Sequence, residues 1–279
     1  MNTAPVDYVL HLADNALILG QRNAEWCGHG PILEEDLALA NNSLDLLGQA
    51  RLLYRHAATL INADAVEAQR FSHLRGARAN GAVTEDTLAY FREAHEFRNH
   101  TLLELPHSGP LAGNVRADRD FATTIARNFF YSALMLLVWS RLQTSADAQL
   151  GAIAGKSLKE VRYHLRHASD WLVRMGDGTD DSHARAQAAL DHLLPYCQAF
   201  WIGSDAETAA VKNGTGVDVA SLQSEWDALV DDTVNEATLR RPATQGYIPQ
   251  GQRGVHSEHM GFLLAEMQSL ARAHPHAVW

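Results

Sequence analysis

Histidines and carboxylates are numerous in this chain, and the chemistry that they could support is metal binding. The 279 residues include 15 histidines and 33 aspartates and glutamates. A di-iron centre in a helical bundle takes one Glu from each of two helices and a Glu-x-x-His pair from each of the other two. Residues three apart share one face of a helix, so this spacing tests whether the chain can hold such a centre.

Glutamate followed by histidine at this spacing occurs once, at Glu104 and His107. Pro106 lies between them and interrupts a helix, so the pair is predicted to lie in a loop that cannot aim both side chains at one ion. The aspartate equivalent also occurs once, at Asp180 and His183, on the expected start of a later helix. Neither pair predicts an iron site.

Two long helices are predicted over about 35–62 and 147–175, and each holds an incomplete version of the Glu-x-x-His pair. Asp45 is followed by Gly48 in one helix, and Glu160 is followed by Tyr163 in the other, so each carboxylate lacks its imidazole. We therefore predict no catalytic, cofactor-binding or metal-binding residue in this chain. These four residues are expected to be degenerate ligand positions.

A polar flank on the second of these helices leaves two interpretations open. Glu160 and His164 are four residues apart and could act together as metal ligands, with His167 one turn further on. Alternatively, the three form a hydrogen-bonded polar seam. The seam is favoured because one helix cannot supply a six-ligand site, and the flank is expected to lack carboxylate partners from the other helices.

The remaining histidines are expected to be structural or exposed. Cys27-Gly-His29 predicts a turn, whereas His256 and His259 are predicted to be capping and surface polar groups at a helix start. Three histidines lie in the segment 62–117, between the second and third long predicted helices, and are predicted to face solvent: His95, His100 and His107.

A glycine-rich stretch, Gly151-Ala-Ile-Ala-Gly155-Lys156-Ser157, resembles a phosphate-binding loop. It is one residue short of that motif, no strand precedes it, and the helical pattern continues into Leu158. It is therefore predicted to be part of a helix.

Apolar residues recur at helical spacing along the chain, which indicates an all-α fold. Two long helices, a crossover over 62–117 and two more long helices are the connectivity of a ferritin-like four-helix bundle. Thr84 is expected to open a helix of about four turns to His100, and Asp118 or Asp120 to open the third core helix. The core helices are predicted over about 6–21, 35–62, 118–145 and 147–175. Additional helices are predicted over about 181–201, 218–239 and 256–273, all within one domain spanning 1–279.

Composition narrows the class of protein further. Lys and Arg number 23 against 33 acidic residues, and the net charge of −10 argues against nucleic-acid binding. Cys27 and Cys197 lie far apart and no secretory leader is evident, so a reduced, cytoplasmic protein is expected. The longest apolar run, 133–139, is too short to span a membrane.

Several stretches resemble the C-subunit family of ring-1,2-phenylacetyl-CoA epoxidases, in order from about residue 7 to 279. They include Leu17-Ile-Leu-Gly-Gln-Arg22, Glu25-Trp-Cys-Gly-His29, Leu44-Asp-Leu-Leu-Gly-Gln-Ala-Arg51, Lys159-Glu-Val-Arg-Tyr-His-Leu-Arg166 and His256-Ser-Glu-His259. The segments 62–83 and 105–118 look longer than the family pattern.

The resemblance implies a multicomponent monooxygenase of phenylacetate degradation. In that family a ferritin-like A subunit carries the di-iron centre and binds phenylacetyl-CoA, and a reductase with FAD and an iron–sulfur cluster delivers electrons from NADPH. The C subunit shares the fold without the iron ligands and pairs with the A subunit. This chain is then expected to be a structural subunit without a cofactor, and a homodimer when alone is plausible. Two alternatives are a self-sufficient metal oxidase using Glu160 and His164, and a stand-alone helical binding scaffold.

Overall fold

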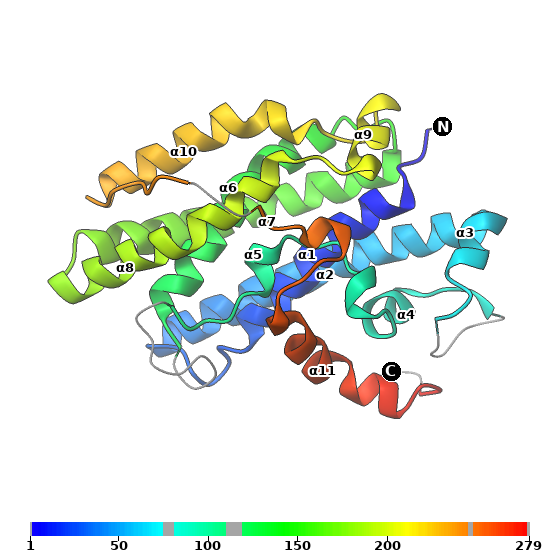
Figure 1. Ribbon diagram of the computed structural model, residues 1–279, viewed down its shortest axis with the longest axis horizontal. Coiled ribbons are helices and arrows are strands. Elements are labelled where there is room, and N and C mark those ends of the chain that lie inside the picture. The colour runs from blue at the N-terminus through cyan, green and yellow to red at the C-terminus, as the bar shows by residue number, and fades with distance from the viewer. Residues whose placement is uncertain (1, 75–80, 110–118, 245–247, 278–279) are drawn as a thin grey trace.

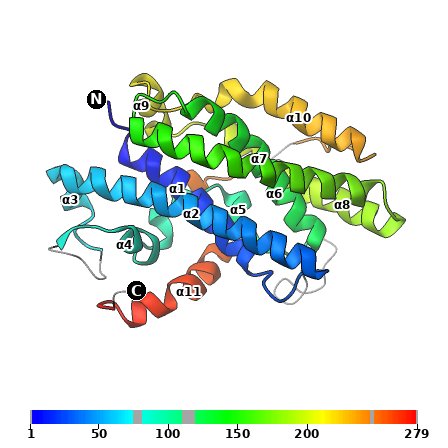
Figure 2. The ribbon, with the colours of Figure 1, turned by 180° about the vertical axis from the view of Figure 1, so that it is seen from behind.

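Four long helices form the frame of the protein: α1 (Val6–Ala24), α2 (Leu33–Ala63), α6 (Phe121–Leu142) and α7 (Ala148–Gly176). The pair α1–α2 and the pair α6–α7 pack side by side, and α2 lies next to α7 (Figure 2). Each of these helices begins and ends within three residues of its predicted bounds. The all-α, ferritin-like fold predicted from the sequence is therefore confirmed.

The computed structural model describes residues 2–74, 81–109, 119–244 and 248–277, and every regular element within these ranges is a helix (Figure 1). Parts of the predicted crossover, and of the segments 62–83 and 105–118, lie outside the described residues.

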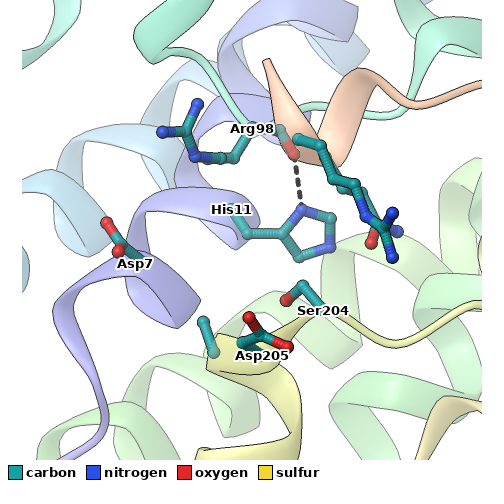
Figure 3. A pocket seen from close by; sticks show the side chains of 8 residues that line it. Asp7, His11, Arg98, Ser204 and Asp205 are labelled. Carbon is teal, nitrogen blue, oxygen red and sulfur yellow. Dashed lines mark hydrogen bonds between the residues drawn. The ribbon is translucent and has the colours of Figure 1, made fainter. Parts of the chain in front are cut away.

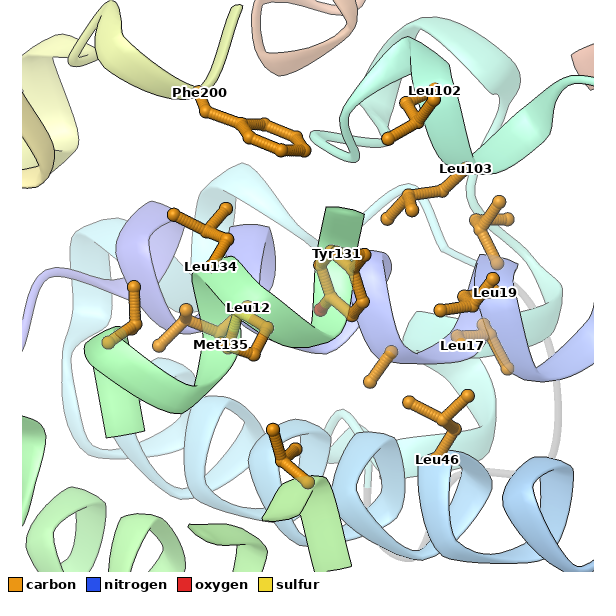
Figure 4. Close-up of a cluster of buried hydrophobic side chains, with 14 of the residues drawn as sticks. Leu12, Leu17, Leu19, Leu46, Leu102, Leu103, Tyr131, Leu134, Met135 and Phe200 are labelled. Atoms are coloured by element: carbon orange, nitrogen blue, oxygen red, sulfur yellow. The ribbon is translucent and has the colours of Figure 1, made fainter. Parts of the chain in front are cut away.

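Buried apolar side chains from all four long helices join in one core that runs from Ala4 to Leu264. Figure 4 shows leucines of α1 and α2 packed with Tyr131 and Met135 of α6 and with Phe200. Burying a leucine or phenylalanine side chain stabilises the fold by about 1.5–3 kcal/mol, so packing of this core is a main source of the stability of the bundle.

Helix α6 is long and apolar enough, by length and composition alone, to cross a membrane. The uninterrupted apolar run in the sequence, 133–139, is shorter than this helix and did not indicate a possible span. However, 89% of the most apolar window of α6 is buried inside the protein, as expected of the central helix of a bundle.

Side chains at the helix starts supply the missing hydrogen bonds of the first turns. Asp120 accepts from the backbone N–H of Ala122, and Asp147 accepts from the N–H groups of Gln149 and Leu150. Asp120, one of two predicted openers, thus begins α6. The phosphate-loop look-alike over 151–157 lies inside α7, as predicted.

The crossover departs from prediction. Thr84 caps a helix as expected, but α4 covers only Glu85–Tyr90 and the chain then runs along α1. The backbone N–H groups of Arg98 and His100 donate to Asp14 and Asn15 of α1, each at 2.8 Å. These bonds replace the helical ones, so the predicted helix to His100 is wrong. Two short helices were not predicted, α3 (Ala65–Arg70) and α5 (Thr101–Glu104).

The helices after α7 are shorter than predicted. α8 (Asp180–Leu193) passes into a 3-10 helix over Leu194–Trp201, because Pro195 cannot donate to the α-helical ladder. The predicted α-helix over 181–201 is therefore too long.

A further helix, α9 (Asp205–Lys212), was not predicted. Its Ser204 cap and Glu207 form a capping box. The last two helices, α10 (Gln223–Glu236) and α11 (Glu258–Ala273), lie within their predicted ranges, and α11 extends away from the bundle (Figure 1).

Candidate functional site

Three side-chain pairs join α2 to α7, and we call this group the polar seam: Glu35, Asp45 and Gln49 of α2 with Glu160, His164 and His167 of α7. His164 Nε2 lies 3.1 Å from Asp45 Oδ2, and His167 Nε2 lies 2.8 Å from Glu35 Oε2. Gln49 donates to Glu160 Oε2 at 2.9 Å. The predicted hydrogen-bonded seam is confirmed, but the expectation that the two histidines lack carboxylate partners is wrong.

Burial governs how the seam titrates. Desolvation lowers the pKa of His164, and its hydrogen bond to Asp45 opposes that shift. Desolvation likewise raises the pKa of Glu160, while the hydrogen bond from Gln49 opposes it. Both shifts arise from a helix–helix contact, and each histidine of the seam has one carboxylate rather than several.

The positions of the two missing imidazoles lie on the outside of the bundle. Tyr163 is exposed, and its ring stacks on His167 with 6.3 Å between ring centroids. A Cβ added to Gly48 would meet no atom within 4 Å. Both positions therefore open to solvent rather than to the interior of the bundle.

The other two core helices decide whether a four-helix ligand set can form. α6 contains no Asp, Glu or His among its 22 residues. On α1 the fully buried Asp14 binds Tyr54 and Arg92. Within the described ranges, no three His, Cys, Asp or Glu side chains lie close enough to hold a metal ion. The residues that the structure describes therefore do not fit a di-iron centre.

A second polar region lies deeper, and we call it the crossover clamp: Asp14, Asn15 and Arg22 of α1 with Arg92, Arg98, His100, Glu104 and His107 of the crossover. Arg92 Nη1 donates to Asp14 Oδ2 at 3.1 Å, and both side chains are fully buried. The Arg92 guanidinium also lies 4.2 Å from the centre of the Phe97 ring. The clamp fixes the crossover against α1.

Two histidines of the clamp were predicted to face solvent, and that prediction is wrong. His107 Nε2 lies 2.6 Å from the carbonyl oxygen of Arg22, and His107 Nδ1 lies 2.6 Å from Thr124 Oγ1. Burial lowers the pKa of both His100 and His107, and for His107 the guanidinium of Arg127 adds to the shift. His95, the third of that group, is exposed as predicted.

The clamp continues into the C-terminal segment through a buried carboxylate. Glu104 is fully buried, and its Oε2 lies 2.7 Å from Nδ1 of His256. Its Oε1 accepts from the backbone N–H of Ser257. His256 is therefore not the surface capping group predicted from the sequence, because it anchors the start of α11 to the crossover. Glu104 and His107 contact different partners, as the intervening proline indicated.

A cavity of about 470 Å³ opens where α1, the crossover and the start of α9 meet (Figure 3). His11 reaches it with Nδ1 held 2.6 Å from the carbonyl oxygen of Arg98. The lining pairs two acidic side chains, Asp7 and Asp205, with two basic ones, Arg98 and Arg253. Because acidic and basic side chains are equal in number, the lining favours neither an anionic nor a cationic ligand.

The fold and the seam together define an all-helical, ferritin-like protein whose central helices are joined by packing and hydrogen bonds. The chain belongs to the phenylacetic acid catabolic protein family, whose model matches residues 1–279. It is similar to the C subunit of the 1,2-phenylacetyl-CoA epoxidase of Escherichia coli (strain K12), with 42% identity over 272 residues, 98% of each chain. The resemblance found in the sequence motifs is thus confirmed.

Proposed function

We propose that this chain is a non-catalytic structural subunit of a phenylacetyl-CoA epoxidase, and that it pairs with and stabilises a catalytic A subunit in the cytoplasm. Its similarity over nearly the full length to the C subunit of such an epoxidase supports membership of a complex of this kind. The observation that carries the non-catalytic part is α6, which offers no carboxylate or imidazole for a four-helix ligand set.

In this proposal, oxygen chemistry takes place in the A subunit, which holds the di-iron centre and phenylacetyl-CoA. One atom of O2 enters the aromatic ring and the other leaves as water, with two electrons from NADPH delivered by a reductase that contains FAD and an iron–sulfur cluster. This chain supplies a rigid helical partner. Its four long helices share an apolar core, and each carboxylate of its seam is paired with one side chain across the α2–α7 contact, so the desolvation cost of a carboxylate cluster shared by four helices does not arise.

The decisive experiment is to express the chain alone and together with the A subunit in iron-supplemented medium, followed by metal analysis and size-exclusion chromatography. We expect the isolated chain to hold far less than one iron per molecule and to turn over no phenylacetyl-CoA with the reductase. We expect the co-expressed chains to elute as one complex.

Two outcomes would overturn the proposal. Two irons per isolated chain, with the absorption band of an oxo bridge, would establish the self-sufficient oxidase instead. Failure of the two chains to elute together would favour a stand-alone scaffold.

A further inference from the structure

From Leu33 to Gly48, the outward face of α2 is apolar although it is open to solvent, and further along the same side carries the exposed Arg51 and Arg55. Leu33, Leu37 and Leu44 are 72%, 56% and 65% exposed, and with Ala40 and Gly48 they follow one side of the helix at spacings of three or four residues. The opposite side of α2 packs into the core, as expected of a bundle helix. From Leu33 to Gly48, helix α2 is therefore apolar on two sides, and only one of them is covered within the residues that the structure describes.

These leucines are not scattered surface residues. Together with Ile32 and Tyr163 they are five of the twelve large apolar side chains that are exposed in the described ranges. Tyr163 belongs to α7, but it stacks on His167, which binds Glu35 of α2. In Figure 2 both helices lie on the side toward the reader, with no described element in front of them. A patch of this kind marks an interaction surface.

The neighbouring side of α7 is basic. Lys156, Lys159 and Arg166 share an outward stripe with Tyr163, again at spacings of three or four residues, and all four are exposed. The chain has only three lysines and a net charge of −10, so two of its lysines lie on this one stripe. We call the two stripes the docking face: Leu33, Leu37, Ala40, Leu44 and Gly48 of α2 with Lys156, Lys159, Tyr163 and Arg166 of α7.

We propose that the docking face binds a helix of the catalytic subunit that presents an apolar stripe flanked by carboxylates. Leu33 to Leu44 span about 16 Å of helix at 1.5 Å per residue, which suits one helix lying against another over three turns. Gly48 has no side chain, and the open space above it lets a partner backbone approach closely. A different chain fits better than a second copy, because two copies with their α7 stripes opposed would set cations against cations. This inference rests on the proposed function.

The test measures affinity for the purified A subunit by calorimetry, with the full-length chain and variants of exposed residues. We expect L37E/L44E to weaken binding on the order of 100-fold, because two carboxylates would be buried without partners. V66E, which also places a glutamate at an exposed apolar position, should bind like the wild type. All variants should keep the wild-type melting temperature, because these side chains lie outside the core.

Charge reversal tests the basic stripe. We expect K156E/K159E to weaken binding about 10-fold at low salt, with the difference shrinking as salt screens the charges. K212E reverses the third lysine, which is exposed on α9 away from the docking face, and should bind like the wild type.

The outcomes separate the two proposals. Wild-type affinity of a folded L37E/L44E variant would overturn the docking face while leaving the complex intact. A wild-type homodimer that L37E/L44E dissociates, while A-subunit binding persists, would overturn it as well. No binding by the wild-type chain would instead overturn the proposed function.

Discussion

The Asp14–Arg92 pair of the crossover clamp and the Asp45–His164 pair of the polar seam each join an aspartate to a basic side chain, yet they lie in different surroundings. In the clamp, Asp14 and Arg92 are fully buried and bind each other. In the seam, the Asp45 side chain is 39% exposed, and its partner His164 is buried. A buried charge that loses its partner has no water to replace it, whereas a half-exposed one does. Position, rather than residue type, decides which pairs hold the fold.

The difference also separates two tasks within one molecule. The clamp ties α1, the crossover and the start of α11 together and leaves no polar atom of Asp14 for other chemistry. The seam lies just beneath the docking face, and its Asp45–His164 pair borders on solvent. The proposed structural role would use both, a rigid interior and an outer face that contacts a partner.

The largest effect is expected in the clamp, from Arg92→Met. Removing the guanidinium leaves the fully buried Asp14 carboxylate with only the Tyr54 hydroxyl and the Arg98 N–H as donors. We expect a loss of about 3–5 kcal/mol in the free energy of unfolding, measured by urea denaturation.

Arg141→Met is the matched control, because it removes a guanidinium from the exposed pair with Glu225. It should cost about 1 kcal/mol or less. Equal losses in the two variants would contradict the distinction between buried and exposed pairs.

The same distinction explains which features could be predicted from the sequence. The four core helices follow from local periodicity, so residues such as Leu158 and Val161 reveal their face without any knowledge of neighbours. The crossover does not, because its course depends on Asp14 and Asn15, some 80 residues earlier in the chain. Hydrogen bonds at that separation leave no periodic signal.

For the candidate site, the missing Glu-x-x-His spacing was readable from the sequence, but the pairing of the seam was not. Asp45 and His164 are 119 residues apart, and which carboxylate meets which histidine depends on how α2 packs against α7. The buried state of His107 was missed for a similar reason, since Arg22 and Thr124 surround it from two helices. A polar residue after a proline looks like a surface loop until its neighbours are known.

An intermediate effect is expected from His107 when pH changes. Its pKa is held well below 6.5 in the folded protein by burial and by nearby guanidinium groups. As pH falls below 6.5, the unfolded chain takes up a proton at this histidine that the folded protein does not, so stability falls. One such group contributes about 1.4 kcal/mol per pH unit in the range between the two pKa values.

Urea denaturation between pH 7.5 and pH 5 measures this slope. In His107→Gln, the slope of the unfolding free energy against pH should decrease by the equivalent of about one bound proton. This holds whatever the variant does to stability at pH 7.5. His95→Gln is the control for loss of an exposed imidazole. An unchanged slope in His107→Gln would mean that the clamp admits the charged imidazole, and that this part of the clamp resembles the seam.

The smallest effect is expected in the seam itself, from His164→Gln. Its partner Asp45 keeps contact with water, so the loss should be about 1 kcal/mol or less. Asp45→Asn should cost a similar amount, and the double variant should give a coupling energy below about 1 kcal/mol. Binding of the A subunit should persist in all three variants, because neither side chain belongs to the docking face. His164→Gln could instead lower the free energy of unfolding as much as Arg92→Met does. The Asp45–His164 pair would then hold α2 against α7 as the clamp holds the crossover against α1. The helices beneath the docking face would then depend on this hydrogen-bonded pair, and apolar packing alone would no longer explain how α2 is held against α7.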